Sequence, residues 1–120
     1  MQQAIPWEFY VSDLGRPLVE REIKDFHLST KEARKLADVM DRVGAASYRP
    51  NDVKSLGEGL WEVRITFNHR IGRILFSVEL NEQCDLLLFA SIKKTQKTPP
   101  SWLELARDRR QKWRERQISL

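Results

Sequence analysis

Two stretches in the middle of the chain alternate between apolar and polar residues. In residues 61–67 the apolar positions are odd-numbered, and in residues 74–80 they are even-numbered with the exception of Leu75. A repeat of two residues is typical of a β-strand that buries one face. Residues 84–92 are apolar almost throughout, which predicts a strand in the centre of a sheet. Because short polar segments separate the three stretches, we expect them to form an antiparallel meander.

The N-terminal part of the chain has helical spacing instead. Residues 7–11 are rich in β-forming residues and predict a first strand. Beyond a turn that ends at Pro17, apolar residues recur at helical spacing up to Phe26. Residues 29–32 have the sequence STKE, a capping box that predicts the start of a second helix, and Gly44 suits its end. We therefore expect one strand followed by two helices in hairpin order.

The C-terminal part predicts one more helix, which begins after two prolines. Ser101 and Glu104 form a second capping box there. The helix carries six basic residues: Arg107, Arg109, Arg110, Lys112, Arg114 and Arg116. These six cannot all face inward, so part of the helix is exposed to solvent or meets an acidic partner. The predicted fold is a single α+β domain over residues 1–120. In it the N-terminal strand and the two-helix hairpin pack on an antiparallel sheet, with the helices on one face, and a C-terminal helix follows.

Composition narrows the class of protein. Of the 120 residues, 41% are hydrophobic, which is enough to bury a core, and no apolar run approaches the roughly 18 residues of a membrane-spanning helix. The chain begins without the basic leader and long apolar region of a signal peptide, so we expect a cytoplasmic protein that has no contact with a membrane. Cys84 is the one cysteine, and the two histidines stand far apart in sequence. We therefore expect no disulfide, no metal site and no other cofactor.

The net charge of +4 arises in the second part of the chain. Residues 1–50 carry eight basic and eight acidic residues, whereas residues 51–120 carry thirteen basic and nine acidic ones. Such asymmetry suggests a polyanionic partner, and a solvated charged surface explains it equally well.

The alternating pattern places two arginines on one face of the sheet. If the apolar residues of the first two strands of the meander face the core, Arg64 and Arg73 face away from it. With an even-numbered hairpin loop, Thr66 lies opposite Arg73, and Arg64 is its diagonal neighbour. Two interpretations remain open. The arginines belong to a surface ion network with Glu62 or Glu79, or they form a clamp for phosphate, whose oxygens match the guanidinium fork.

Three lysines gather where the third strand of the meander ends. Lys93 shares the face of Phe89 and Ser91 if the even-numbered positions of this strand face the core, and Lys94 and Lys97 follow it. In one hairpin register Lys93 would lie beside the arginine pair. The alternative is a solvated loop, which is the usual role of closely spaced lysines.

The sequence contains no catalytic triad, paired carboxylates, Walker loop or glycine-rich dinucleotide motif. If the protein is an enzyme, its lysine and arginine side chains would have to carry out the catalysis. RNA cleavage permits that, because the substrate's own 2′-hydroxyl can attack the adjacent phosphorus while the protein orients the backbone and stabilises the developing charge. A lysine with a lowered pKa could move a proton. Lys54, just before a glycine-rich turn, is a further cation, whereas His69 at a hairpin tip is interpreted as an exposed turn residue.

Three motifs carry a resemblance to a known family. They are GLWEVR at residues 59–64, RILF at residues 73–76 and IKKTQKTP at residues 92–99, and an arginine-rich helix follows. With these motifs the chain resembles the RelE/ParE toxin superfamily, and it is most similar to the HigB-like, phage-derived branch. The resemblance covers roughly residues 54–110. The first fifty residues agree with the family only in the order of their elements.

The resemblance implies a RelE-like compact α+β fold and a toxin of a type II toxin–antitoxin module. Characterised members of this kind that are RNases cleave mRNA, mostly on the ribosome, with basic residues on the sheet. Carried over by position, the catalytic residues would be Arg64, Arg73, Lys93 and Lys94. The RNA-binding residues would be Lys54, Lys97, Arg107 and Arg110. The implied partner is a helix-turn-helix, HigA-like antitoxin with an acidic contact surface, through which alone the toxin would reach operator DNA.

Three functions remain open at this stage. The lysine block, which is the IKKTQKTP motif, favours an mRNA endoribonuclease. The alternatives are a ParE-like inhibitor of DNA gyrase without nuclease activity and a non-toxic nucleic-acid-binding domain. One feature departs from the family. Several members place a tyrosine or histidine near the end of the last strand as acid or base, and this chain has neither after His69. A lysine would therefore have to take that role.

Overall fold

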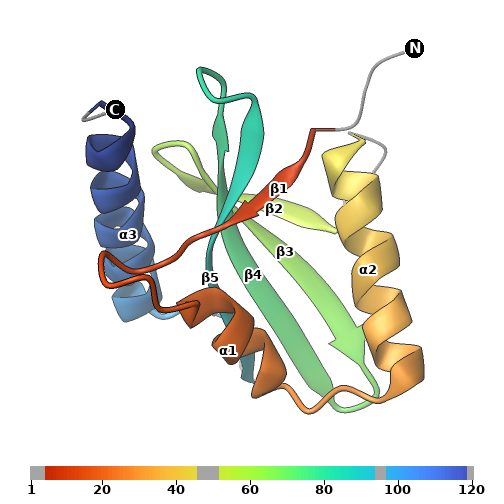
Figure 1. The fold of residues 1–120 in the computed structure, drawn as a ribbon. Coiled ribbons are helices and arrows are strands. Elements are labelled where there is room, and N and C mark those ends of the chain that lie inside the picture. Colours follow the sequence, from red (N-terminus) through yellow and green to blue (C-terminus); the bar gives the residue numbers. More distant parts are fainter. Residues whose placement is uncertain (1–4, 46–51, 94–96, 119–120) are drawn as a thin grey trace.

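The computed structural model describes residues 5–45, 52–93 and 97–118 (Figure 1). In chain order the elements are β1 (Trp7–Phe9), α1 (Leu18–Lys24), α2 (Thr30–Gly44), β2 (Val53–Gly57), β3 (Leu60–Phe67), β4 (Arg70–Glu79), β5 (Cys84–Lys93) and α3 (Pro100–Ile118). The predicted α+β class, the two-helix hairpin, the three-stranded meander and the C-terminal helix are confirmed. β1 is shorter than predicted, and β2 is a strand that the sequence pattern did not assign.

The five strands form one sheet in the order β1-β5-β4-β3-β2. The pairs β2–β3, β3–β4 and β4–β5 are antiparallel, as the short connections require. β1 pairs with β5 in parallel, through Trp7 to Phe9 against Asp85 to Leu87. The expectation of an antiparallel sheet is therefore wrong at this edge. The chain leaves β1, passes through two helices and the meander, and returns beside β1 in the same direction.

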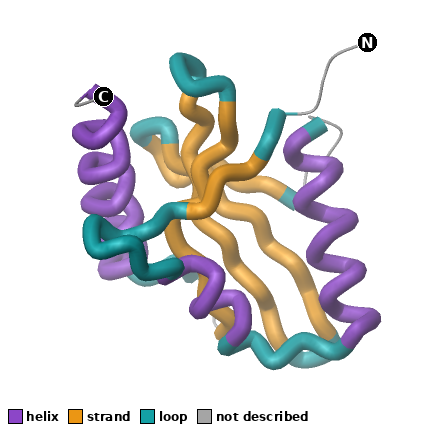
Figure 2. Tube along the Cα trace, viewed as in Figure 1, coloured by secondary structure: helices purple, strands orange, loops and turns teal. Residues whose placement is uncertain are grey.

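Helices cover both faces of the sheet, with α2 on one side and α3 on the other (Figures 1 and 2). Two successive residues of β4 demonstrate this, because neighbouring residues of a strand point to opposite faces. A Cβ on Gly72 would lie 3.4 Å from the ring of Phe26, which follows α1. Arg73 faces the ring of Trp102 on α3. The expectation of helices on one face holds for α1 and α2 only, and α3 buries the second face.

Caps and turns fix the ends of the helices. The predicted capping box of α2 is present, since Glu32 N donates to Ser29 Oγ at 3.1 Å and Ser29 N donates to Glu32 Oε1 at 2.9 Å. α3 begins at Pro100, so Ser101 lies in its first turn rather than at the predicted cap position. Proline suits this place because the first helical N–H needs no partner.

Two further observations concern the described residues as a whole. None of the helices that the structure describes is long and apolar enough to cross a membrane. Within the same ranges, no three acidic, histidine or cysteine side chains are grouped so that they could hold a metal ion.

Candidate functional site

Arg64 and Arg73 lie directly opposite each other on β3 and β4. The hairpin closes at the pair Phe67 and Arg70, which leaves a two-residue turn in which Asn68 has a φ of 23°. The predicted register, with Thr66 opposite Arg73, is therefore wrong, because the two-residue turn consists of Asn68 and His69 and not of His69 and Arg70. The consequence is a closer arginine pair than predicted, since directly opposed residues have Cβ atoms only about 5 Å apart.

Arg73 is fully buried, with 0% of its surface exposed. It faces away from α1 and α2, as predicted, but α3 covers it, and its guanidinium carbon lies 5.9 Å from the centre of the Trp102 ring. Its Nε, Nη1 and Nη2 have no hydrogen-bond partner among the residues that the structure describes. Burial lowers the pKa of Arg73 below its usual range, Glu62 opposes this shift, and Arg64 adds to it. A guanidinium nevertheless stays charged in proteins, so Arg73 is a buried cation that has no acceptor in the part of the chain that the structure describes.

Glu62 lies on the same face and is also fully buried. Its Oε1 accepts from Arg64 Nε at 2.5 Å, and its Oε2 accepts from Thr98 Oγ1 at 2.7 Å. The ion network that the sequence left open is thus present between Glu62 and Arg64. Glu79 pairs instead with Arg114 of α3, at 2.7 Å. Among the described residues, Glu62 thus pairs with Arg64 but makes no hydrogen bond with Arg73, and this part of the face carries an excess of positive charge.

The lysines predicted as site residues differ in how close the structure places them to Arg64 and Arg73. Lys54 is exposed on β2 and pairs with Glu62 across the strands, so it shares the face of the arginines. Lys93 ends β5 and pairs with Ile71, two residues beyond the pair of Arg73 with Ser91. Its side chain and all of Lys94 lie outside the described residues. Lys97 is exposed and immediately precedes Thr98.

Arg107 and Arg110, predicted to bind RNA, contact the turn between β2 and β3. Arg107 Nε lies 2.9 Å from Glu58 Oε2, and Arg110 Nη1 donates to the Glu58 carbonyl at 2.8 Å. Burial lowers the pKa of Arg110. Both arginines thus fasten α3 to the strand that carries Lys54, and their role as RNA contacts stays a prediction. His69 is exposed at the hairpin tip, as predicted.

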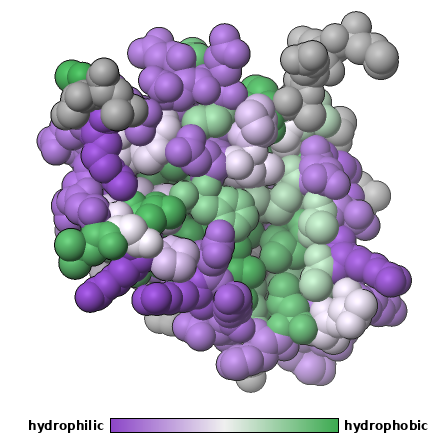
Figure 3. All heavy atoms as spheres, viewed as in Figure 1, coloured by the Kyte–Doolittle hydropathy of each residue, from purple (hydrophilic) through white to green (hydrophobic). Residues whose placement is uncertain are grey.

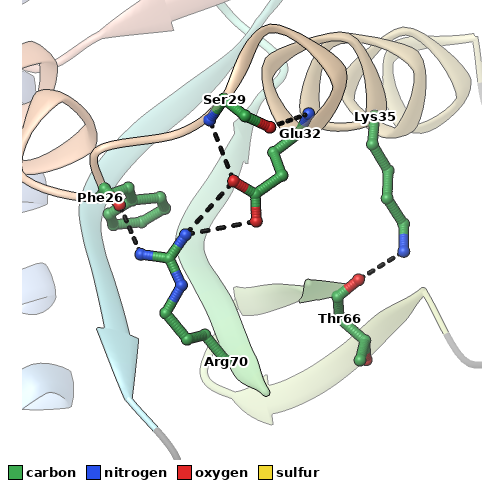
Figure 4. Close-up of polar contacts among 6 residues, drawn as sticks. All are labelled: Phe26, Ser29, Glu32, Lys35, Thr66 and Arg70. Atoms are coloured by element: carbon green, nitrogen blue, oxygen red, sulfur yellow. Dashed lines mark hydrogen bonds and ion pairs between the residues drawn. The ribbon is translucent and has the colours of Figure 1, made fainter. Parts of the chain in front are cut away.

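The arginine hairpin consists of β3 and β4, the strands that carry Arg64 and Arg73. Its tip is fixed to α2 (Figure 4). Arg70 Nη1 donates to the Phe26 carbonyl at 2.6 Å, and Arg70 Nη2 lies 3.3 Å from Glu32 Oε2. Lys35 Nζ donates to the Thr66 carbonyl. The hydrogen bond from the Ser29 backbone holds the pKa of Glu32 below its usual range, with a smaller contribution from Arg70. The capping carboxylate of α2 therefore also anchors the strands that position Arg64 and Arg73.

Sequence reasoning anticipated Glu62 as a partner of Arg64 but missed two other residues of the site. It did not foresee that the ring of Trp102 lies over Arg73. Thr98 belongs to the lysine block, and nothing in its spacing indicated that it would reach β3.

A comparison with protein families gives one match. Residues 22–111 fit the model of the family described as "Phage derived protein Gp49-like (DUF891)". Because the match spans most of the chain, from α1 into α3, this chain belongs to the Gp49-like family. It is a family of RelE/HigB-like toxins, which confirms the resemblance to the superfamily and is compatible with a toxin of a toxin–antitoxin module. The HigB branch stays a prediction. No curated protein matches the sequence.

Proposed function

We propose that this chain is the toxin of a type II toxin–antitoxin module and that it cleaves mRNA at the face of the sheet that carries Arg64 and Arg73. One observation carries the proposal: the opposed arginine pair, in which the buried Arg73 guanidinium has no acceptor among the described residues. A buried donor without a partner costs free energy, and a buried charge costs more. A phosphate group would supply the oxygens and the negative charge that Arg73 does not find among the described residues.

The chemistry of the proposed site uses charge and orientation. The 2′-hydroxyl of the RNA attacks the adjacent phosphorus, and the bond from that phosphorus to the 5′-oxygen of the next nucleotide breaks. Arg64, whose side chain is 25% exposed, receives the phosphate first, and Arg73 adds its charge from behind. The two cations stabilise the additional negative charge of the phosphorane. In this proposal Lys93 or Lys94 moves the protons, because no tyrosine or histidine follows His69.

The proposed partner is a helix-turn-helix antitoxin with an acidic contact surface. The excess of basic residues in the second part of the chain supports this choice, because opposite charge speeds the capture of a toxin. Bound across Lys54 and the lysines after β5, such a surface would keep RNA from the arginine pair. Operator DNA would be contacted by the antitoxin and not by this chain.

Purified protein tests the proposed activity. It is incubated with ribosomes that hold a defined mRNA and, separately, with the same mRNA free in solution, and the fragments are separated by size. We expect cleavage by the wild type and a loss of about a hundredfold or more in the rate for Arg64→Gln, because one charge-stabilising donor group is removed. Arg34→Gln is the matched control: this exposed arginine lies on α2, which covers the other face of the sheet, so its variant should cleave.

Intact RNA under all these conditions would refute the nuclease. If such a protein still arrests growth, supercoiling by purified DNA gyrase in its presence decides whether it acts like ParE. Cleavage that persists in Arg64→Gln would support the nuclease activity but exclude the arginine pair as its site.

A further inference from the structure

We infer that Glu62 is the positioning residue of the proposed site: it orients Arg64 and ties the arginine pair to the segment that leads into α3. This inference rests on the proposed function, since it assigns a role at the same site. It concerns a residue that would not touch the RNA but would fix the side chains that do.

The two oxygens of Glu62 have different tasks. Oε1 accepts from Arg64 Nε at 2.5 Å, which fixes the plane of that guanidinium. Oε2 accepts from Thr98 Oγ1 at 2.7 Å, which holds the chain just before Pro99 and Pro100. Both are charge-assisted hydrogen bonds within a fully buried residue, where such bonds are stronger than in water. Glu62 is therefore held from two sides and has little freedom to turn.

Through Thr98, this carboxylate also reaches the cover of Arg73. Thr98 lies two residues before the start of α3, and Trp102 in the first turns of that helix lies over the Arg73 guanidinium. Glu62 on β3 thus sets the position of Arg64 directly and that of the Trp102 cover through the chain. Glu62 therefore connects the partly exposed Arg64 with the surroundings of the buried Arg73.

The negative charge of Glu62 should weaken the binding of RNA, although the same carboxylate orients Arg64. As the carboxylate nearest the pair it attracts the arginines, but it repels a phosphate that approaches them. Removing this charge should therefore tighten the binding of RNA while it disturbs the orientation of Arg64. A group that serves only the stability of the fold would change neither property in the folded molecules.

The first test separates binding from turnover. Cleavage is measured with Glu62→Gln, Thr98→Val and Thr98→Ser, and the rates are corrected for the folded fraction from thermal unfolding. For Glu62→Gln we expect kcat to fall roughly ten- to a hundredfold, as for a misplaced reacting group, while KM decreases. Thr98→Val should lower kcat with KM unchanged, and Thr98→Ser, which keeps the hydroxyl, should restore it. Unchanged kcat per folded molecule in both Glu62→Gln and Thr98→Val would overturn the inference.

The second test does not depend on cleavage. The Nε–H signals of Arg64 and Arg73 are followed by NMR while inorganic phosphate is added. We expect the Arg64 signal to exchange slowly with water in the wild type and fast in Glu62→Gln, and we expect the variant to bind phosphate more tightly. Identical signals and identical phosphate affinity would overturn the inference. If these expectations are met while no RNA is cleaved, the inferred role of Glu62 stands as that of an anion site and the proposed nuclease fails.

Discussion

Arg73 and Arg109 are the two buried arginines among the residues that the structure describes, and their surroundings differ in a way that separates structure from function. Arg109 donates to Glu22 at 3.1 and 2.8 Å and to the Leu88 carbonyl at 2.9 Å, so its charge and its donors are satisfied. Arg73 is buried more deeply and has no acceptor among the described residues. Removing a cation of the first kind is strongly destabilising, because it leaves its buried partner unpaired. A cation of the second kind lowers the stability of the fold and is consistent with a site that binds an anion.

This difference predicts opposite effects of the same substitution. Arg109→Met should lower the free energy of unfolding by about 3 kcal/mol or more, because it leaves a partly buried carboxylate unpaired. Arg73→Met should be nearly neutral or stabilising, because it removes a buried charge that makes no hydrogen bond with any described residue. Urea unfolding of both variants measures the difference. Equal destabilisation would mean that the contact of Arg73 with Trp102 is structural, and the anion site would lose its main support.

A second residue predicts how stability depends on pH. Asp85 is 3% exposed, and burial raises its pKa from 3.8 to about 6. Between these values the folded state holds a proton that the unfolded state has released, so the free energy of unfolding should fall as the pH rises from 4 to 6. The loss is at most about 3 kcal/mol. Asp85→Asn should remove it and be the more stable protein at pH 8. A difference between the two proteins that is the same at pH 4 and pH 8 would contradict this account.

At the scale of the elements, side chains complete an edge that β1 leaves uncovered. β1 pairs with β5 only from Asp85 to Leu87. Beyond it, Arg109 binds the Leu88 carbonyl, and Glu22 Oε1 accepts from Ala90 N at 3.0 Å. α1 and α3 thus place one ion pair where a longer strand would lie, which protects the edge against pairing with another chain.

The start of α2 allows a second prediction at this scale. Ser29→Ala should lower the free energy of unfolding by about 1 kcal/mol, because it removes the acceptor for Glu32 N. Glu32→Ala should cost more, since this carboxylate also binds Arg70 of the hairpin. Thermal unfolding measures both, with the neighbouring exposed Thr30→Ala as a control. A cost for Glu32→Ala no larger than that for Ser29→Ala would show that the link to the hairpin contributes nothing.

The elements were largely predictable, and their arrangement was not. Alternation identified the meander and the capping box identified α2, because these signals act within a few residues. The register of the arginine hairpin depends on a two-residue turn at Asn68, and the parallel pairing of β1 depends on contacts distant in sequence. One residue indicated that the face of the sheet under α3 is also buried. Leu75 stands among the polar positions of β4, and it is fully buried in the structure. The arginine face was foreseen, but its burial under α3 was not.

At the scale of the whole molecule, the two faces of the sheet have different characters. Apolar side chains gather in a hollow on the face that α1 and α2 cover (Figure 3). The groove there has a volume of about 330 Å³, and its lining includes Trp7, Leu36, Met40 and Ile74. Ile74 and Arg73 are neighbours on β4, so this groove and the arginine pair lie on opposite faces. An RNA on the basic face would therefore leave the apolar groove accessible.

The basic face predicts how RNA binding depends on salt. Contacts of a single strand with Lys54 and Arg64 should release counterions and give a slope of about −1.4 for log K against log salt concentration, whereas Arg73 is buried behind them. Lys54→Gln should reduce this slope by about 0.7. Lys112→Gln is the control, because that exposed lysine pairs with Asp108 on α3. Fluorescence anisotropy of a labelled, non-cleavable RNA gives the affinities, and equal slopes for both variants would contradict the assigned face.

Whether the arginine pair acts on RNA in cells is tested by a map of mRNA 5′ ends within minutes of induced expression in a bacterial host. The wild type is compared with Arg73→Met, and both proteins are quantified in the soluble fraction. If the arginine pair acts on RNA phosphates, new 5′ ends arise inside reading frames with the wild type and are absent with the variant. Growth arrest with intact mRNA, or the same new ends with Arg73→Met, would contradict the claim.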